Sequence, residues 1–189
     1  MAQPSCSQFV LAAAVALVAP VAMAQSAVPS TAPGASGAHA TRVAHADASF
    51  LKQAAENGNA EVESSKLALT KATNDKVKAF AQQMIDDHTK AGNELKALAT
   101  SKGVEVSSEP SLMQQGKLKL LSTADGAKFD QKYADEMGVK AHEDTVKLFE
   151  KASREAKDPE VKAWAAKTLP TLKTHLEHAR TLKVAVGKS

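Results

Sequence analysis

The chain has 189 residues, of which 43% are hydrophobic and 24% are charged, and its formal net charge is +3. Acidic and basic residues are interspersed, with one Trp, one Tyr and no Arg cluster beside aromatic residues, which argues against a nucleic-acid-binding protein. The single cysteine, Cys6, precedes the apolar run near the N-terminus, so the sequence also argues against a disulfide scaffold or an iron–sulfur site.

Residues 1–24 are predicted to be a secretory signal peptide. They contain no charged residue, and the apolar run Phe9–Ala19 is shorter than the roughly 20 residues that a membrane span needs. Ala22-Met23-Ala24 fits the small-residue cleavage pattern before Gln25. The first eight residues lack the usual Lys or Arg, so an uncleaved anchor is the alternative. We therefore expect a periplasmic or secreted protein with no membrane segment after cleavage.

Residues 25–46 are predicted to be a disordered linker. Ala, Ser, Pro, Gly, Thr and Val dominate this segment, whose only residue with a permanent charge is Arg42. Such a composition buries too little apolar area to offset the entropy lost on ordering. His39 and His45 are therefore interpreted as solvated linker residues.

Two helices are predicted to follow, over residues 47–72 and 75–101. Asp47 and Asn74 are their expected N-cap residues, and Gly103 is expected to end the second helix in the left-handed region. Small or apolar residues recur at helical spacing in both segments. In the first segment they are Phe50, Ala54, Gly58, Ser65 and Ala68, and in the second Val77, Ala81, Met84, Ala91, Leu95 and Leu98.

Residues 103–124 form the longest predicted connection, with a short helix in its apolar second half. A third helix is predicted over 125–156, and Asp158-Pro159-Glu160 is a strong start signal for a fourth that continues through Leu182. The sequence thus predicts an all-α four-helix bundle over 47–184, followed by a tail. The long connection is typical of a ferritin-like crossover, although an up-down-up-down bundle also accommodates these lengths.

Each predicted long helix carries one metal-capable residue on its core stripe: Glu61, His88, His142 and His175. Glu61 and His88 lie at nearly equal distances from the turn that joins their helices, and so do His142 and His175. Residues meet in an antiparallel pair only when these distances match. We therefore expect all four side chains to be buried on facing helices.

Two interpretations fit these four residues. One is a metal site for Zn, Cu or Fe, because imidazole and carboxylate groups suit these ions. The other is a structural network in which Glu61 accepts hydrogen bonds from the histidines, with Asp135 joining and no cofactor bound. His178 stands one turn beyond His175 and is the expected additional ligand.

Three groups of residues carry a family resemblance. They are Phe80-Ala81 with Met84 and Asp87-His88; Phe129-Asp130 with Tyr133 and His142; and Leu169-Pro170 with Leu172, His175 and Leu176. On these residues the chain resembles the exported bacterial family catalogued as domain of unknown function 4142, over about Asp47 to Leu182. The resemblance implies an exported bundle that is ferritin-like in fold, and no settled activity.

One motif of ferritin-like di-iron proteins is missing. Such proteins carry Glu-x-x-His on two helices. Here Ile85 and Leu172 stand three residues before His88 and His175. The sequence therefore argues against ferroxidase or oxygenase chemistry.

The leading hypothesis is an exported ferritin-like bundle that binds a transition metal through its Glu/His cluster. The alternative is a non-enzymatic envelope stress or interaction protein with a structural polar core. No catalytic residue is predicted, because the mature chain lacks Cys and has no Ser in a strand-turn-helix elbow. The sequence does not identify a protein partner or an oligomeric state.

Overall fold

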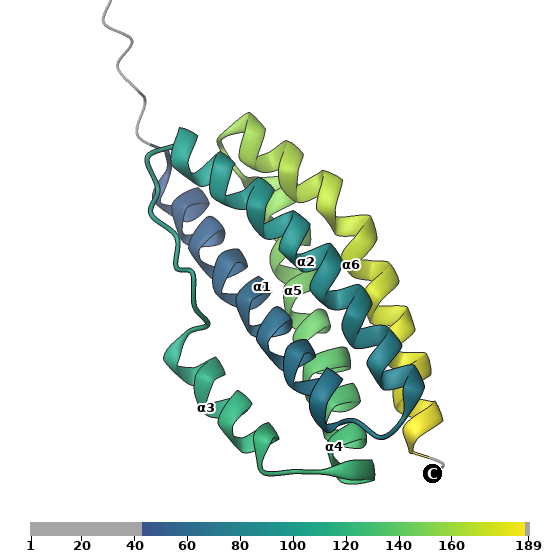
Figure 1. Ribbon diagram of the computed structural model, residues 1–189. Coiled ribbons are helices and arrows are strands. Elements are labelled where there is room, and N and C mark those ends of the chain that lie inside the picture. Colours follow the sequence, from purple (N-terminus) through teal and green to yellow (C-terminus); the bar gives the residue numbers. More distant parts are fainter. Residues whose placement is uncertain (1–42, 188–189) are drawn as a thin grey trace, which may run out of the picture. The chain divides into compact units, whose positions relative to one another are not determined.

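Residues 43–187 are described by the computed structural model, and every regular element among them is a helix (Figure 1). The predicted all-α class is therefore confirmed. The predicted signal peptide lies outside the described residues, as does the predicted linker up to residue 42. No helix in the described part of the chain is both long enough and apolar enough to cross a membrane.

Helices α1 (His45–Lys71) and α2 (Asp75–Ser101) form the first antiparallel pair. The side chain of Asn74 caps α2 as predicted, accepting a 2.9 Å hydrogen bond from the Lys76 N–H. Gly103 ends α2 with φ of +66°, also as predicted. The Val104 N–H donates to the Ala99 carbonyl at 2.9 Å, which satisfies one of the last helical carbonyls.

Asp47 does not have the role predicted from the sequence. It lies inside the first turn of α1, and Ala44 is the N-cap. Its buried carboxylate instead accepts hydrogen bonds from the backbone N–H groups of Lys157 and Asp158, at 2.9 and 2.7 Å. Asp47 therefore satisfies the turn between the last two helices, 110 residues away in sequence.

The connection from α2 to α4 runs the length of the helices. At one end Lys102, just after α2, pairs with Asp158 at 2.8 Å. At the other end the buried carboxylate of Asp130, in α4 (Gly126–Lys132), accepts hydrogen bonds from the backbone N–H groups of Thr73 and Asn74. Helix α4 thus begins at the α1–α2 turn, which is incompatible with the up-down-up-down alternative.

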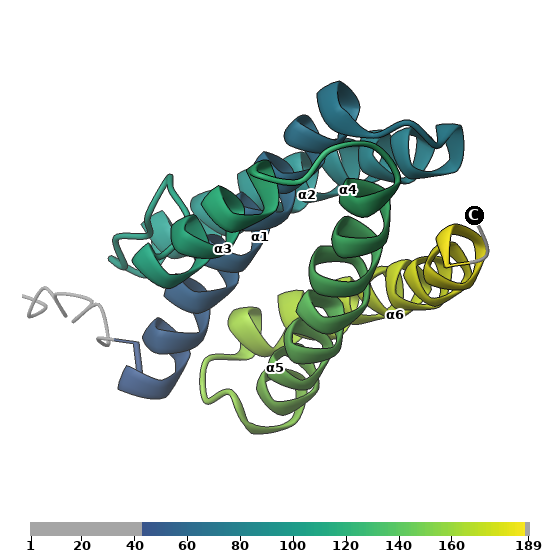
Figure 2. The same cartoon turned by 90° about the horizontal axis from the view of Figure 1, so that it is seen from below.

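The short helix predicted in this connection is α3 (Leu112–Ser122), which contacts α1 and lies along it (Figure 2). A capping box starts it. The Ser111 hydroxyl accepts from the Gln114 N–H, and the Gln114 side chain accepts from the Ser111 N–H at 2.9 Å.

The third long segment is not the continuous α-helix that was predicted over 125–156. A π-helix, η1 (Tyr133–Lys140), separates α4 from α5 (Ala141–Glu155). At Gly138 within η1, an added Cβ would lie 3.1 Å from the Ala179 Cβ of α6, so the two helices approach closely there. The wider π turn also changes which side chains face the core on either side of it.

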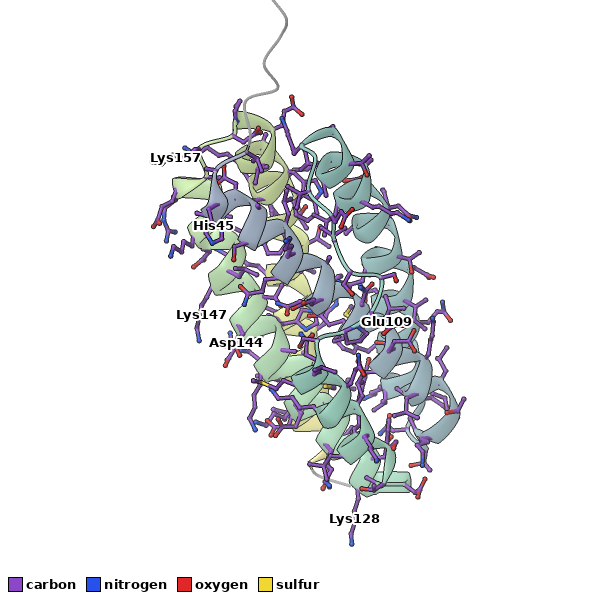
Figure 3. All side chains as sticks on the ribbon, turned by 90° about the vertical axis from the view of Figure 1, so that its left-hand side faces the viewer. His45, Glu109, Lys128, Asp144, Lys147 and Lys157 are labelled. Carbon is purple, nitrogen blue, oxygen red and sulfur yellow. The ribbon has the colours of Figure 1, made fainter. Side chains whose placement is uncertain are left out.

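Helix α6 (Pro159–Val186) packs against η1 and α5 to form the second pair. The Asp158 side chain caps it as predicted, accepting from the N–H groups of Glu160 and Val161. Charged side chains such as Lys128, Asp144 and Lys147 point outward from the helices (Figure 3). Apolar residues make up most of the core between the two pairs, and a polar cluster lies within it.

Candidate metal centre

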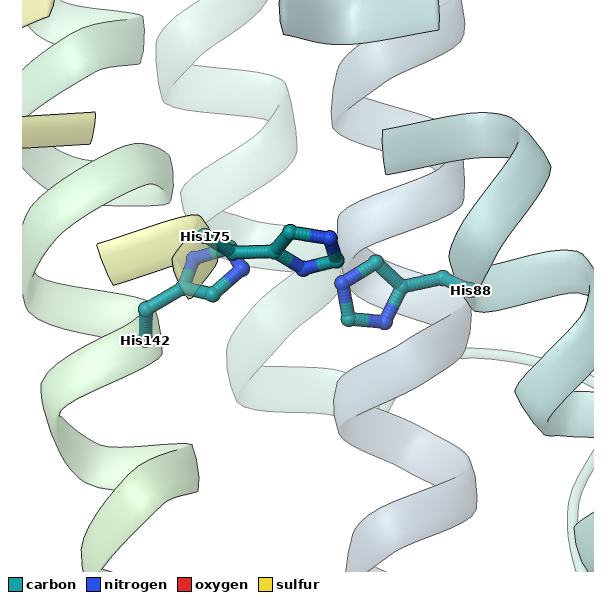
Figure 4. A group of neighbouring side chains, drawn as sticks. All are labelled: His88, His142 and His175. Atoms are coloured by element: carbon teal, nitrogen blue, oxygen red, sulfur yellow. The ribbon is translucent and has the colours of Figure 1, made fainter. Parts of the chain in front are cut away.

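The polar cluster consists of Glu61 on α1, His88 on α2, His142 on α5 and His175 on α6. All four residues are buried, none more than 7% exposed. One ring nitrogen from each histidine lies within 4.8 Å of the other two, and the three rings point toward one another (Figure 4). The ring centroids are 5.3–5.6 Å apart. Residues predicted to lie level on facing helices therefore do meet.

Glu61 joins the histidines through one carboxylate oxygen. Its Oε2 lies 2.6 Å from His88 Nε2 and 3.4 Å from His142 Nε2. Neither contact has hydrogen-bond geometry. Among the described residues four inward-facing atoms consequently lack a hydrogen-bond partner: Glu61 Oε2, His88 Nε2, His142 Nε2 and His175 Nδ1. An unsatisfied buried polar atom costs roughly 1–3 kcal/mol. The ion pair offsets this cost for Glu61 and His88, whereas a bound cation would offset it for all four atoms.

Hydrogen bonds on the outer side of two histidines fix their orientation. His142 Nδ1 lies 2.8 Å from the Gly138 carbonyl, to which it donates. His175 Nε2 lies 2.9 Å from the Asp87 carboxylate and donates to it. These partners assign the proton to the outer nitrogen of each ring and leave the inner nitrogen with a lone pair. Metal-binding histidines are commonly held in this way.

The π-helix contributes directly to this arrangement. The carbonyls of Met137 and Gly138, both in η1, lie 3.3 and 2.8 Å from His142 Nδ1. His142 follows η1 by two residues, so its ring folds back onto the widened turn. Single π turns inside α-helices recur at functional sites.

The other carboxylate oxygen of Glu61 starts a chain of hydrogen bonds toward α3. Glu61 Oε1 accepts from the Thr145 hydroxyl at 3.4 Å, and that hydroxyl accepts from the Asn57 amide at 3.2 Å. The Asn57 side-chain oxygen accepts from the Gln114 amide at 2.8 Å. These hydrogen bonds fix the side of the Glu61 carboxylate that faces away from the histidines. The last residue in the series, Gln114, belongs to the capping box of α3.

The electrostatics keep the carboxylate charged and one histidine neutral. Burial raises the pKa of Glu61, but the nearby imidazoles of His142 and His88 outweigh burial and lower that pKa to about 2. Burial lowers the pKa of His88, but the Glu61 carboxylate outweighs it, so the net shift is upward. Burial lowers the pKa of His175 to about 4 despite its hydrogen bond with Asp87. At neutral pH, Glu61 is therefore anionic and the inner nitrogen of His175 is free to bind a cation.

Two residues predicted near the site are not brought into it. His178 is exposed on α6, because a step of three residues carries it round the helix to the solvent edge. Asp135 lies in η1 and pairs with Lys140 and Lys183 at the surface, so it does not join the polar network as expected. The π-helix changes the register on which that expectation rested.

Two supporting residues were not identified from the sequence. Asp87 was not among the predicted ligands, yet it orients His175 across the contact between α2 and α6. Thr145, three residues after His142, supplies the hydroxyl that contacts Glu61. Its position one turn after His142 on the same helix could have indicated that it lies at the site.

Comparison with known proteins found one matching family model and one solved structure of similar fold. A family model described as "Domain of unknown function (DUF4142)" matches residues 32–182. The fold is similar to the crystal structure of a DUF305 fragment from Deinococcus radiodurans, with a TM-score of 0.66 and 14% sequence identity. The similarity covers 78% of this chain and 99% of that chain, and it concerns the fold alone. No curated protein matches the sequence.

Proposed function

The chain belongs to the DUF4142 family, and we propose that it is an exported, ferritin-like helical-bundle protein that binds one transition-metal ion. The ligands are Glu61, His88, His142 and His175. The observation that carries the proposal is the convergence of one carboxylate and three imidazole side chains, all buried, from four different helices.

Two further observations support the fold and location in this proposal. The connection that runs the length of the helices between α2 and α4 is the feature expected of a ferritin-like bundle. Residues 1–24 have the composition of a signal peptide, which supports export to the periplasm or beyond. No membrane or nucleic-acid partner is part of the proposal.

Three imidazole nitrogens and one carboxylate oxygen form a donor set that suits Zn²⁺, Cu²⁺ or Fe²⁺. One carboxylate is too few for a di-iron centre, in which several Glu residues bridge or flank two ions. A single ion fits the charge as well, because the anionic Glu61 offsets one of the two charges of a divalent ion and the neutral imidazoles donate lone pairs to it. The outer partners of His142 and His175 then hold these rings in the ligating orientation.

Metal content and calorimetry of the purified protein test this proposal. We expect one Zn²⁺ per chain, and loss of that binding in the double variant His88→Ala plus His175→Ala. His178→Ala is the matched control, since His178 is exposed on the same helix as His175. Absence of binding, or binding that the double variant leaves unchanged, would refute the proposal.

The alternative function is a non-enzymatic envelope stress or interaction protein whose polar cluster is structural. The 2.6 Å contact between Glu61 and His88 supports it, because it is also the contact expected of a buried carboxylate–imidazolium pair. The alternative predicts a melting temperature that neither Zn²⁺ nor a chelator changes. The same purified protein therefore distinguishes the two functions.

A further inference from the structure

A cavity of about 390 Å³ opens beside the candidate metal centre. Its lining includes three of the four proposed ligands, Glu61, His88 and His175. Pockets of this size hold small organic molecules. The cavity therefore connects the donor atoms to a space that is larger than an ion requires.

Small side chains one turn from the site create this space. Gly58 stands three residues before Glu61, and Gly92 stands four after His88. Both line the cavity, and a Cβ added to either would meet no atom within 4 Å. On the other two helices the cavity is lined by Thr145 and Thr171. Each of the four helices thus presents a short side chain on the same side of the site.

The cavity has an apolar inner wall and a polar rim. Buried residues of the wall are Leu95, Phe149, Trp164 and Leu172. Exposed residues of the rim include Glu63, Lys66, Asn93, Lys96 and Ser107, and Glu63 pairs with Lys66 at 2.8 Å. A molecule can therefore enter from solvent at the rim and place an apolar body against the wall.

The charge at the bottom of the cavity favours an anion. A divalent ion held by three neutral imidazoles and the Glu61 carboxylate leaves one net positive charge in a buried site. Asp87 contacts His175, but its side chain is 40% exposed and solvent screens its charge. A buried excess charge is stabilised most by an opposite charge in direct contact.

We propose that this cavity binds a small organic monocarboxylate, whose oxygen becomes an additional ligand of the metal and whose apolar chain lies against Trp164, Phe149 and Leu172. This inference rests on the proposed function, because it needs the metal in place. It extends that function by adding a fifth, exchangeable ligand to the four protein ligands. Zinc in catalytic sites likewise keeps an exchangeable position and can expand to five ligands.

Visible absorption of the Co²⁺-loaded full-length protein tests the inference. We expect acetate and butyrate to change the Co²⁺ bands saturably. Butyrate should bind several-fold more tightly than acetate, because each added methylene gains apolar contact. The probes are simple carboxylates, so a saturable change reports an added ligand at the metal.

A matched pair of glycine substitutions locates the binding. Gly58→Leu fills the cavity and should weaken butyrate binding at least tenfold while Co²⁺ affinity stays within about twofold. Gly116→Leu, on exposed α3 outside the cavity, should leave both affinities unchanged. Both replace a helical glycine, so helix propensity favours folding of both variants.

The possible results of these experiments distinguish the cavity inference from the proposed metal binding. Co²⁺ binding without any spectral response to carboxylates overturns the cavity inference and leaves the metal proposal standing. A response that Gly58→Leu does not weaken overturns the assignment to this cavity. Failure of the wild-type protein to bind Co²⁺, Zn²⁺ or Cu²⁺ overturns the proposed function and the inference with it.

Discussion

The two sides of the metal centre are built differently. Toward the α1–α2 turn the core is filled by large side chains, and Phe129 stacks on Tyr133 with centroids 6.0 Å apart. The Tyr133 hydroxyl is hydrogen-bonded to Ser65 at 2.8 Å. Toward the opposite end Phe50, Phe149 and Trp164 pack together, but between them and the site glycines and threonines leave the cavity that begins at Gly58.

This difference shows how one bundle combines a fixed site with access to it. On the packed side, the carbonyl of Gly138 holds His142, and Gly138 itself packs closely against Ala179. On the open side the cavity lies against Glu61, His88 and His175. The packed half thus holds the ligand geometry, and the open half admits a second ligand.

The largest expected effect lies in the packed half. Phe129→Ala should lower the free energy of unfolding of the metal-free protein by about 3–5 kcal/mol, because it removes a fully buried ring. Denaturant unfolding measures this change. Leu112→Ala, at a residue 87% exposed, serves as the control and should change stability by no more than about 0.5 kcal/mol. A Phe129→Ala loss below about 1 kcal/mol would show that this half is not tightly packed.

The second-largest expected change in the free energy of unfolding comes from metal binding. Free Zn²⁺ at 100 times its dissociation constant should add about 2.7 kcal/mol to the free energy of unfolding, because the ion binds only the folded state. A thermal melt with Zn²⁺ and then with excess chelator measures this. The double variant His88→Ala plus His175→Ala should show no shift, and an equal shift in that variant would place the metal elsewhere.

Asp87→Asn should reduce Zn²⁺ affinity by about 10- to 100-fold, since Asp87 orients His175 and raises the basicity of its ring. Calorimetric titration gives the affinity. The control is Asp86→Asn, at the neighbouring residue, which is exposed and accepts a hydrogen bond from Gln82. Equal affinities for the two variants would contradict a role for Asp87 at the centre.

The smallest expected changes in stability come from two glycine substitutions, one in the open half and one in the packed half. Gly58→Ala should raise the free energy of unfolding by about 0.5–1 kcal/mol, because alanine favours the helix and the open half has room for its methyl group. Gly138→Ala should lower it, because its Cβ would press on Ala179 at 3.1 Å. Denaturant midpoints of the two variants give the signs, and stabilisation by both would remove the distinction between the halves.

The sequence was sufficient to place the proposed ligands level within each helix pair, because core-stripe spacing and distance from a turn are local quantities. It did not fix the height of one pair against the other. Glu61, His88, His142 and His175 all lie where those two rules put them. The rules assume a regular α-helix, so they do not reveal η1, in which Gly138 packs closely against Ala179 of another helix.

Residues whose partners lie on another helix were harder to predict. Asp87 and Asp135 each precede a candidate histidine in the sequence. Asp87 contacts His175, whereas Asp135 pairs with lysines at the surface. Which of two acidic residues faces the core is set by helix rotation and packing, which one sequence does not specify. The cavity was not inferred either, because it depends on small residues from four helices meeting at one level.

The two buried aspartates at opposite ends of the helices link the helix pairs to one another. Asp47, from the first pair, satisfies the turn of the second, and Asp130, from the second, satisfies the turn of the first. Each pair alone would leave the N–H groups of its own turn without these carboxylate acceptors. We therefore expect the two pairs to fold and unfold together in a single cooperative transition, with neither persisting as a stable intermediate.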